Sequence, residues 1–277
     1  MTSSPASLEQ RLEAVIRPCG QLLTAYSGGV DSTLVAVAAR RVLGRSNAPA
    51  AVGDSASLPR RELEEARRIA EQTDLELVEI NPGEQQDSRY QANAGDRCYF
   101  CKTHLYAALH DLANARGIRC IANGTNADDL GDHRPGLRAA DEAQIVSPLL
   151  EAGLTKADVR TLAEHYRLPN ADKPAAACLA SRIPYGTAVT AERLTRVERA
   201  EDALYTLGFR GFRVRHHETV ARIELPPDQW PRLLDPAVRE QVIEKLQAVG
   251  YTYITLDLAG FRSGSSNAML NAAGDRA

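Results

Sequence analysis

The chain has 277 residues, a formal net charge of -3 and 44% hydrophobic residues, so it can bury a substantial core. The first residues do not show the basic start and apolar stretch of a signal peptide. No run approaches the ~20 apolar residues that a membrane-spanning helix needs. We therefore expect a cytoplasmic protein with no membrane partner. The acidic balance argues against nucleic acid as the main partner. Five cysteines without an export signal favour reduced, metal-bound or catalytic thiols over a disulfide framework.

The first strong pattern along the chain is a glycine-rich turn between two apolar runs. Residues 22–26 predict a buried strand, and residues 33–43 predict a helix. Between them lies the hexapeptide SGGVDS, which consists of Ser27, Gly28, Gly29, Val30, Asp31 and Ser32. Glycines let the backbone approach a ligand closely, and Asp31 or Ser32 can cap the helix so that its free amide groups point into the loop. The pattern therefore predicts a phosphate site.

The exact sequence of this turn indicates which kind of phosphate site it forms. A Walker loop needs a lysine after its last glycine, the dinucleotide fingerprint needs GxGxxG, and neither is present. The hexapeptide resembles the PP-loop of the N-type ATP pyrophosphatases, which cleave ATP between the α and β phosphates. This resemblance implies that the loop binds the pyrophosphate end of ATP together with Mg2+. An ordinary strand, turn and helix with closely packed glycines is the alternative interpretation.

Strands and helices then alternate. Strands are predicted at 50–53, 75–80 and 118–123, and an amphipathic helix at 60–72. Repeated units of this kind predict a doubly wound α/β parallel sheet with ligands at the carboxyl ends of its strands. Asp54, Ser55 and Gly124 fall at such ends. Asp54 and Ser55 are candidates to contact adenine or ribose, with capping of the next helix as the alternative.

From about residue 190 the pattern changes to a small α+β domain. Thr190 predicts the start of a helix that Gly208 ends, alternating segments follow at 212–217 and 221–225, and a helix at 235–249 precedes a strand at 251–258. We therefore expect a PP-loop domain at residues 1–188. A smaller domain at residues 189–277 is expected to bind substrate and to mediate oligomerisation.

Two arginines alternate with apolar residues at the start of this smaller domain. Arg213 and Arg215 share one face of the predicted strand, and Arg222 and Glu224 could share it if the next segment forms a hairpin. The planar guanidinium fork matches phosphate and carboxylate groups. A phosphate or carboxylate site is therefore one interpretation, and a solvated sheet face is the other.

The cysteines suggest sulfur or metal chemistry. Cys98 and Cys101 form a CxxC pair, and Cys178 lies in the segment KPAAACLASR. A CxxC pair can be a redox couple, half of a zinc site or two ligands of an iron–sulfur cluster, and no second CxxC or HxxxH completes a zinc site. Three thiolates would leave one iron of a four-iron cluster open. Cys19 and Cys120 lie at element edges and are interpreted as small buried hydrophobes.

Seven strings spread over nearly the whole chain make the resemblance more specific. They are SGGVDS, SLPRREL at 57–63, RCYFCK at 97–102, NGTNADDLGDHRPG at 123–136, SPL at 147–149, CLASRIPYG at 178–186 and ARIE at 221–224. Together they resemble the LarE family of ATP-dependent sulfur transferases, which help to make the nickel-pincer nucleotide of lactate racemase. The resemblance implies a homo-oligomer that adenylates the carboxylates of a pyridinium mononucleotide and converts them to thiocarboxylates.

The same resemblance leaves two sources of sulfur open. In the sacrificial branch, the cysteine at the position of Cys178 gives up its own sulfur and becomes dehydroalanine. In a second branch, three cysteines hold a [4Fe-4S] cluster whose open iron carries the sulfide. Cys98, Cys101 and Cys178 match the second branch, which we prefer. Packing of Cys98 and Cys101 at a helix start is the alternative.

Charged groups complete the expected site. Three basic residues next to the cysteines could stabilise a thiolate: Arg97, Lys102 and Arg182. The resemblance gives Arg213 and Arg215 a ligand, the mononucleotide phosphate, with Glu224 as an orienting or metal-binding group. Three acidic residues could bind Mg2+, act as a base or cap turns: Asp128, Asp129 and Asp132.

Three other functions share part of this pattern. A PP-loop tRNA thiolase also combines the loop with CxxC, but it predicts a broad basic surface. An ammonia-dependent adenylating synthetase has no need of the cysteines. A non-enzymatic cluster scaffold would form no AMP. Net acidity argues against the first, the cysteine triad against the second and the intact hexapeptide against the third.

Overall fold

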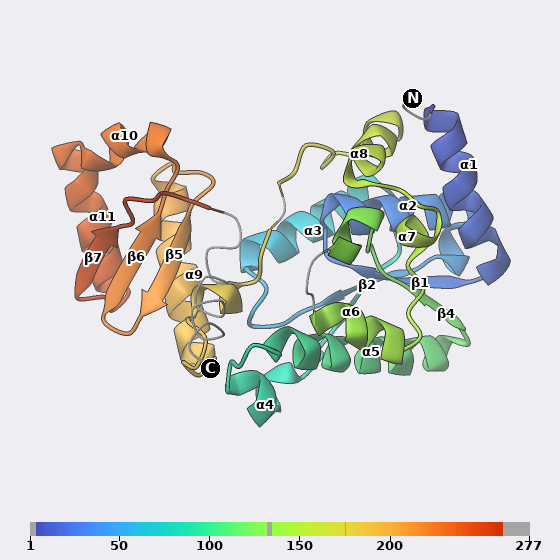
Figure 1. The fold of residues 1–277 in the computed structure, drawn as a ribbon, viewed down its shortest axis with the longest axis horizontal. Helices are drawn as coiled ribbons and strands as arrows, with labels where there is room; N and C mark the ends of the chain where they lie inside the picture. The colour runs from blue at the N-terminus through green and yellow to red at the C-terminus, as the bar shows by residue number, and fades with distance from the viewer. Residues whose placement is uncertain (1–3, 132–134, 175, 263–277) are drawn as a thin grey trace. The chain divides into compact units, whose positions relative to one another are not determined.

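The computed structural model describes residues 4–131, 135–174 and 176–262, and it divides into two compact units (Figure 1). Unit 1 comprises Met1–Glu84 and Cys98–Ala176, and unit 2 comprises Gln85–Arg97 and Ala177–Ala277. Unit 2 is therefore assembled from two stretches of the chain. Each unit has its own sheet.

Unit 1 contains a four-stranded sheet in the order β3-β2-β1-β4, and every neighbouring pair is parallel. The strands are β1 (Leu22–Tyr26), β2 (Ala50–Gly53), β3 (Leu77–Ile80) and β4 (Cys120–Ala122). Because β1 is covered on both faces, four of its five residues are buried, including Thr24. The predicted parallel sheet is confirmed.

Helices cover both faces of this sheet, as a doubly wound fold requires (Figure 1). One core cluster joins Leu22 and Tyr26 of β1 to four helices, which are α1 (Pro5–Ile16), α2 (Val30–Leu43), α3 (Arg60–Gln72) and α8 (Lys156–His165). Another cluster joins Leu23 to α5 (Arg97–Arg116) and α6 (Pro135–Glu142). The short helix α7 (Pro148–Glu151) contributes Leu149 to the first cluster. Within the described residues, no helix has the length and apolar character needed to cross a bilayer.

Unit 2 contains a three-stranded sheet in the order β5-β6-β7. Strand β5 (Arg213–His217) pairs antiparallel with β6 (Val220–Glu224), and β6 pairs parallel with β7 (Tyr253–Leu256). Its core includes side chains from α9 (Ala191–Thr206), α10 (Trp230–Leu234) and α11 (Pro236–Ala248). Thr190 and Asp235 cap α9 and α11, so the predicted small α+β arrangement is confirmed. The short helix α4 (Ser88–Gln91) belongs to the other stretch of this unit.

The structure differs from the sequence predictions at some boundaries. Helix α2 begins at Val30 with Gly29 as its N-cap, so neither Asp31 nor Ser32 caps it. The division into units also assigns residues 85–97 and 177–188 to unit 2, whereas the predicted boundary followed residue 188. A physical reason is that buried Asn93 donates hydrogen bonds to three carbonyl groups between residues 183 and 187.

Candidate functional site

The SGGVDS loop leaves β1 through a backbone conformation that favours glycine. Gly28 has φ +71°, and a Cβ atom placed on it would lie 2.8 Å from the Ala66 Cβ of α3. The left-handed φ and the close approach to α3 both act against a side chain at this position. Gly28 thus lets the loop pack directly on α3.

Two serines hold the loop closed across the turn. The Ser27 amide donates to Ser32 Oγ at 3.2 Å, and the two serine hydroxyls lie 3.1 Å apart. Ser32 Oγ also donates to the Gly29 carbonyl at 3.1 Å. The first turn of α2 that follows has N–H groups without intrahelical acceptors and carries the positive end of the helix dipole. This arrangement can bind an anionic ligand.

The loop after β4 lies against the first turn of α2. A Cβ atom on Gly124 would lie 2.8 Å from the Ser32 amide nitrogen, so only glycine allows this approach without a shift. Asn126 is 1% exposed and donates through Nδ2 to Asp31 Oδ1 at 2.8 Å. The structure therefore brings Gly124, Asp31 and Ser32 together. Asn126 lies within the NGTN string but was not among the predicted site residues.

Asp54 and Ser55 follow β2, and neither caps the next helix. Helix α3 has Pro59 as its N-cap and no side-chain cap, so the capping alternative is wrong. Asp54 forms an ion pair with Arg60 at 2.5 Å. Ser55 Oγ lies 2.8 Å from Ser57 Oγ and donates to Glu84, a carboxylate that is 1% exposed. These contacts form a polar cluster at the carboxyl end of β2.

The acidic residues after β4 bind backbone and lysine groups. Asp129 Oδ2 accepts from the Asn126 amide at 3.1 Å, and Asp129 Oδ1 lies 3.5 Å from Lys156 Nζ. Asp128 Oδ2 accepts from the Lys156 backbone amide at 2.8 Å. Both carboxylates therefore stabilise turns, which was one of the three interpretations. Asp132 lies outside the described residues.

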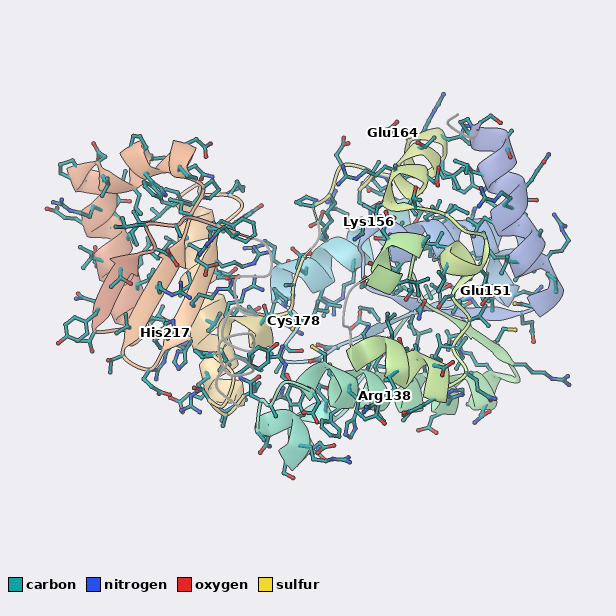
Figure 2. The ribbon with its side chains drawn as sticks, viewed as in Figure 1. Arg138, Glu151, Lys156, Glu164, Cys178 and His217 are labelled. Carbon is teal, nitrogen blue, oxygen red and sulfur yellow. The ribbon has the colours of Figure 1, made fainter. Side chains whose placement is uncertain are left out.

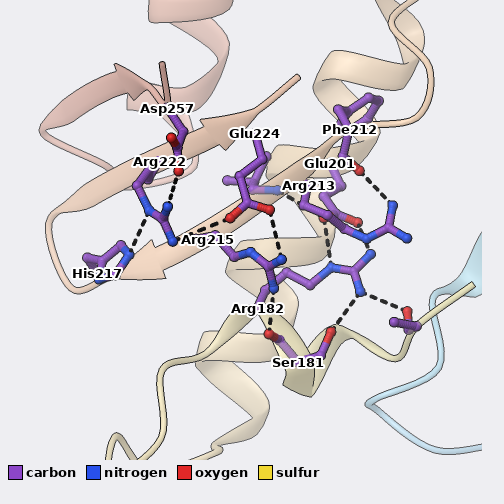
Figure 3. Close-up of polar contacts among 12 residues, drawn as sticks. Ser181, Arg182, Glu201, Phe212, Arg213, Arg215, His217, Arg222, Glu224 and Asp257 are labelled. Carbon is purple, nitrogen blue, oxygen red and sulfur yellow. Dashed lines mark hydrogen bonds and ion pairs between the residues drawn. The ribbon is translucent and has the colours of Figure 1, made fainter. Parts of the chain in front are cut away.

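In unit 2 the hairpin register places the predicted polar residues on one face. The two segments form the hairpin that the sequence analysis allowed, and its register, which the sequence left open, pairs Arg213 with Glu224 and Arg215 with Arg222. Arg215 binds Glu224 at 2.8 Å, and their side chains are 8% and 1% exposed (Figure 3). Arg222 forms an ion pair with Asp257. For Arg215 the solvated-face interpretation is therefore wrong, because this guanidinium is buried and paired.

The segment that carries Cys178 is attached to this arginine face. Cys178 (Figure 2) precedes a 3-10 turn at Leu179–Arg182. Its carbonyl accepts from Ser181 Oγ at 2.8 Å and from Arg182 at 2.9 Å. Arg182 also forms two hydrogen bonds with Glu201, at 2.9 and 3.1 Å. Arg215 donates to the Ser181 carbonyl at 2.8 Å. Hydrogen bonds thus link the backbone next to Cys178 to both α9 and β5.

The charges of this group do not balance. It contains three guanidinium groups, of Arg182, Arg213 and Arg215, and the two carboxylates of Glu201 and Glu224. Arg213 donates to the Phe212 carbonyl at 2.7 Å and has no carboxylate partner among the described residues. Burial, and then the neighbouring Arg182, lower the pKa of Arg213 to about 10. An anion beside Arg213 would relieve this unfavourable environment.

The cysteines divide between the two units. Cys98 and Cys101 lie in the first two turns of α5, and a spacing of three residues places them on one helix face. Both belong to unit 1, whereas Cys178 belongs to unit 2. Over residues 4–131, 135–174 and 176–262, no three His, Cys, Asp or Glu side chains lie together as metal ligands. In the same residues, no disulfide joins the cysteines.

The remaining cysteines and basic residues have mainly structural contacts. Burial, and then a hydrogen bond with Cys120, raise the pKa of Cys19 to about 12. Cys19 and Cys120 pack against the unit 1 core, but both are only partly buried, whereas buried positions were predicted. Arg97 is buried and donates to Asn93 and to the Ala180 carbonyl. Arg97 and Arg182 therefore use their guanidinium groups to hold the backbone of unit 2.

Comparisons with known proteins give one family match and several relatives. The family described as NAD synthase matches residues 6–103, which include the SGGVDS loop. An uncharacterized protein of Synechocystis sp. is 45% identical, covering 95% of this chain and 99% of its own. An uncharacterized protein of Methanocaldococcus jannaschii is 26% identical, covering 88% of this chain and 91% of its own.

A third relative carries a functional name. The pyridinium-3,5-bisthiocarboxylic acid mononucleotide synthase of Lactiplantibacillus plantarum is 38% identical, covering 97% of this chain and 96% of its own. The matched region therefore extends over nearly the whole length of both chains. The chain belongs to the LarE family, of which this synthase is a member.

Proposed function

We propose that this protein is an ATP-dependent sulfurtransferase acting on pyridinium-3,5-biscarboxylic acid mononucleotide. It converts the two carboxylates to thiocarboxylates and releases AMP and pyrophosphate. The observation that carries the proposal is the network in unit 2, where Arg182 and Arg215 bind the backbone next to Cys178 and Arg213 supplies a positive charge that no carboxylate of the described residues pairs with. The name of the Lactiplantibacillus plantarum relative supports the choice of product.

Carboxylate activation explains the need for ATP. A carboxylate resists attack by a thiolate because it is negatively charged and has no good leaving group. Attack of a carboxylate oxygen on the α phosphorus of ATP forms an acyl adenylate, and pyrophosphate leaves. A sulfur nucleophile then attacks the acyl carbon, and AMP leaves. The chain must therefore bind a departing pyrophosphate and position a sulfur atom.

The PP-loop fits the first of these tasks. Amide groups at the start of α2 bind the β and γ phosphates and stabilise the charge that develops as pyrophosphate departs. Asp31 is the loop carboxylate that fits Mg2+, and Asn126 fixes its orientation. Mg2+ supplies further charge neutralisation when bound. Asp54 and Ser55, at the carboxyl end of β2, are assigned to adenosine.

The arginine face fits the substrate. Arg182 and Arg215 are paired with carboxylates, so they position the Cys178 segment instead of neutralising a ligand. Arg213 carries the excess charge and is assigned to the phosphate of the mononucleotide. This refines the expectation that Arg213 and Arg215 act alike. Glu224 has an orienting role, because it holds Arg215.

The proposed source of sulfur involves three cysteines: Cys98, Cys101 and Cys178. Cys98 and Cys101 lie on one helical turn and fit two ligands of a [4Fe-4S] cluster, with Cys178 as the third ligand. When bound, such a cluster would supply the sulfide that is transferred. In the alternative route, Cys178 Sγ displaces AMP, and the thioester is then cleaved by elimination. Loss of the Cα proton breaks the Cβ–Sγ bond, leaving dehydroalanine in the chain and a thiocarboxylate on the product.

Oligomerisation is proposed to use unit 2. Its exposed apolar side chains include Leu258 at 81%, Tyr253 at 62% and Leu234 at 56%. Apolar groups with this exposure suit burial against a second copy of the chain. Sedimentation velocity of the full chain tests this, with a monomer at all concentrations as the contradicting result.

One anaerobic experiment tests the function and separates the sulfur sources. The protein is purified without oxygen, its visible absorption is recorded, and it is incubated with ATP and the biscarboxylate nucleotide while AMP, thiocarboxylate and protein mass are followed. We expect iron–sulfur absorption, AMP formation and unchanged protein mass with added sulfide. Loss of sulfur from Cys178 would instead establish the sacrificial route. Absence of both AMP and thiocarboxylate would overturn the proposed function.

Cysteine variants sharpen this test. Cys178→Ser should abolish transfer by either route. Cys98→Ser and Cys101→Ser should abolish it only by the cluster route, and a single turnover by these variants would exclude that route. Cys19→Ser is the matched control, because Cys19 packs against the unit 1 core away from the CxxC pair.

A further inference from the structure

A buried asparagine outside the SGGVDS motif is hydrogen-bonded to the phosphate loop. Asn170 follows α8 in unit 1 and is 4% exposed. Its Nδ2 donates to the Gly28 carbonyl at 3.0 Å and to Thr33 Oγ1 at 3.0 Å. A carbonyl oxygen can only accept, so the amide nitrogen must face the loop and the orientation of this side chain is fixed.

The oxygen of this side-chain amide lacks a hydrogen bond. Asn170 Oδ1 is buried and forms no hydrogen bond within the described part of the chain. Leaving a polar acceptor unsatisfied is unfavourable, and an apolar residue would avoid that cost. The hydrogen bonds that the amide nitrogen donates to the loop therefore explain an asparagine at this position better than core packing does.

The contacts of Asn170 determine which way the loop peptides face. The Gly28 carbonyl and the Gly29 amide belong to one planar peptide and point in opposite directions. Asn170 holds the Gly28 carbonyl, while Thr33 Oγ1 donates to the Gly29 carbonyl at 2.8 Å. Both carbonyl oxygens are thus directed toward protein donors. The amides of Gly29 and Val30 consequently face away from those donors.

The segment around Asn170 is itself fixed to α3. Lys173 Nζ lies 2.8 Å from a Glu62 carboxylate oxygen and 3.2 Å from one of Glu65. The next residue of α3, Ala66, makes the close approach to Gly28. Gly28 is therefore held between α3 on one side and Asn170 on the other. Rotation of the Gly28–Gly29 peptide requires breaking one of these contacts.

We propose that Asn170 is a positioning residue that orients the PP-loop for the β and γ phosphates of ATP. This inference rests on the proposed function only in taking ATP as the ligand of the loop. Without the Asn170 donor, the Gly28–Gly29 peptide loses one of its restraints and keeps the hydrogen bond from the Gly29 amide to Ser27 Oγ at 3.4 Å. Rotation of this peptide then becomes easier, and the rotated peptide presents a carbonyl oxygen toward the phosphates. Affinity for ATP and pyrophosphate falls, whereas affinity for AMP, which lacks those phosphates, does not.

The test compares Asn170→Ala, Asn170→Asp and Asn170→Ser in the full chain. Binding of ATP, pyrophosphate and AMP is measured by titration calorimetry with Mg2+, and folding by urea denaturation. Asn170→Ala should bind ATP and pyrophosphate on the order of 10-fold more weakly and AMP as the wild type does. Asn170→Asp should lose more, because it adds negative charge beside the loop. Asn170→Ser retains one donor and should recover part of the affinity.

Asn47 offers a matched control, because its Nδ2 also donates to a backbone carbonyl, that of Leu43, at 3.0 Å. Asn47→Ala and Asn47→Asp should leave all three affinities unchanged. Unchanged ATP binding in folded Asn170→Ser and Asn170→Ala would overturn the inference, as would an equal loss for AMP. If Asn170→Ala does not fold, the Asn170→Ser result decides. A wild type that binds ATP but transfers no sulfur would refute the proposed function and leave this inference standing.

Discussion

Replacing Gly28 by alanine should deform the phosphate loop and weaken ATP binding. The added Cβ atom would lie 2.8 Å from Ala66 Cβ and 3.0 Å from Ala66 Cα. Real side chains do not approach so closely, so either α3 or the loop must move. The alanine would also have to adopt a φ near +71°, which is unfavourable for any residue with a Cβ atom.

The cost of the left-handed backbone and the cost of the contact with α3 can be separated by comparing Gly28→Ala with an alanine variant of a second glycine, Gly117. The left-handed backbone costs about 1–2 kcal/mol for alanine, and forcing extra atoms into a packed contact adds about 1–3 kcal/mol. Gly117 has φ +68°, and a Cβ atom added there would meet nothing within 4 Å, so Gly117→Ala carries only the first cost. Gly28→Ala should therefore lower the free energy of unfolding by about 1–3 kcal/mol more than Gly117→Ala.

Urea denaturation of both variants measures this difference, and calorimetric titration with ATP measures the effect on the loop. Gly28→Ala should bind ATP at least about 10-fold more weakly, whereas Gly117→Ala should bind it as the wild type does. Adding Ala66→Gly to Gly28→Ala removes the nearer contact and should restore part of the affinity. Equal destabilisation by the two alanines, together with normal ATP binding, would refute the packing of Gly28 on α3.

Three further variants test the network of unit 2 and its pH dependence. Arg182→Met should lower the free energy of unfolding by about 3–5 kcal/mol, because it leaves the buried Glu201 carboxylate unpaired; adding Glu201→Leu should recover most of that loss in urea denaturation. Arg213→Met should leave the urea midpoint unchanged. It should weaken binding of the mononucleotide substrate by roughly 10-fold or more in calorimetry. Wild-type affinity in this variant would show that Arg213 does not bind the substrate phosphate. Burial lowers the pKa of His216 below its usual 6.5, so the unfolded chain binds more protons and stability should fall as pH drops below 6.5. His216→Gln should flatten the fall in urea midpoint between pH 7.5 and 5.5, and an unchanged slope would contradict this.

Local sequence features predicted the elements well where short-range chemistry determines them. The amphipathic pattern of α3 predicted its observed bounds, Arg60–Gln72, and Thr190 and Asp235 correctly predicted the starts of α9 and α11. The start of α2 was predicted three residues late. Asp31 and Ser32 both have side chains typical of caps, but the backbone already turns at Gly29. Residue type alone cannot distinguish a cap from a first-turn residue.

The partners of the site residues were harder to predict. Asn126 contacts Asp31 across 95 positions, and Asn170 contacts Gly28 across 142. No periodicity connects residues so far apart, so only the tertiary fold reveals such contacts. Arg213 and Arg215 are likewise equivalent in the sequence, because both are arginines on the same face of one predicted strand. Their difference in pairing arises because Glu224 reaches Arg215, and this depends on side-chain direction within the hairpin.

The two stretches that build unit 2 affect the order in which the chain can fold during synthesis. Gln85–Arg97 leaves the ribosome roughly 80 residues before Ala177, a delay of roughly 4–16 s at ~5–20 residues per second. During that time the amide of Asn93 lacks the carbonyl groups of residues 183–187 that it binds in the finished protein. While unit 1 folds, the segment Gln85–Arg97 therefore lacks the residues that it binds in the finished protein. Truncation after residue 176 would leave this segment permanently in that state, so unit 1 expressed alone is expected to be prone to proteolysis between residues 85 and 97.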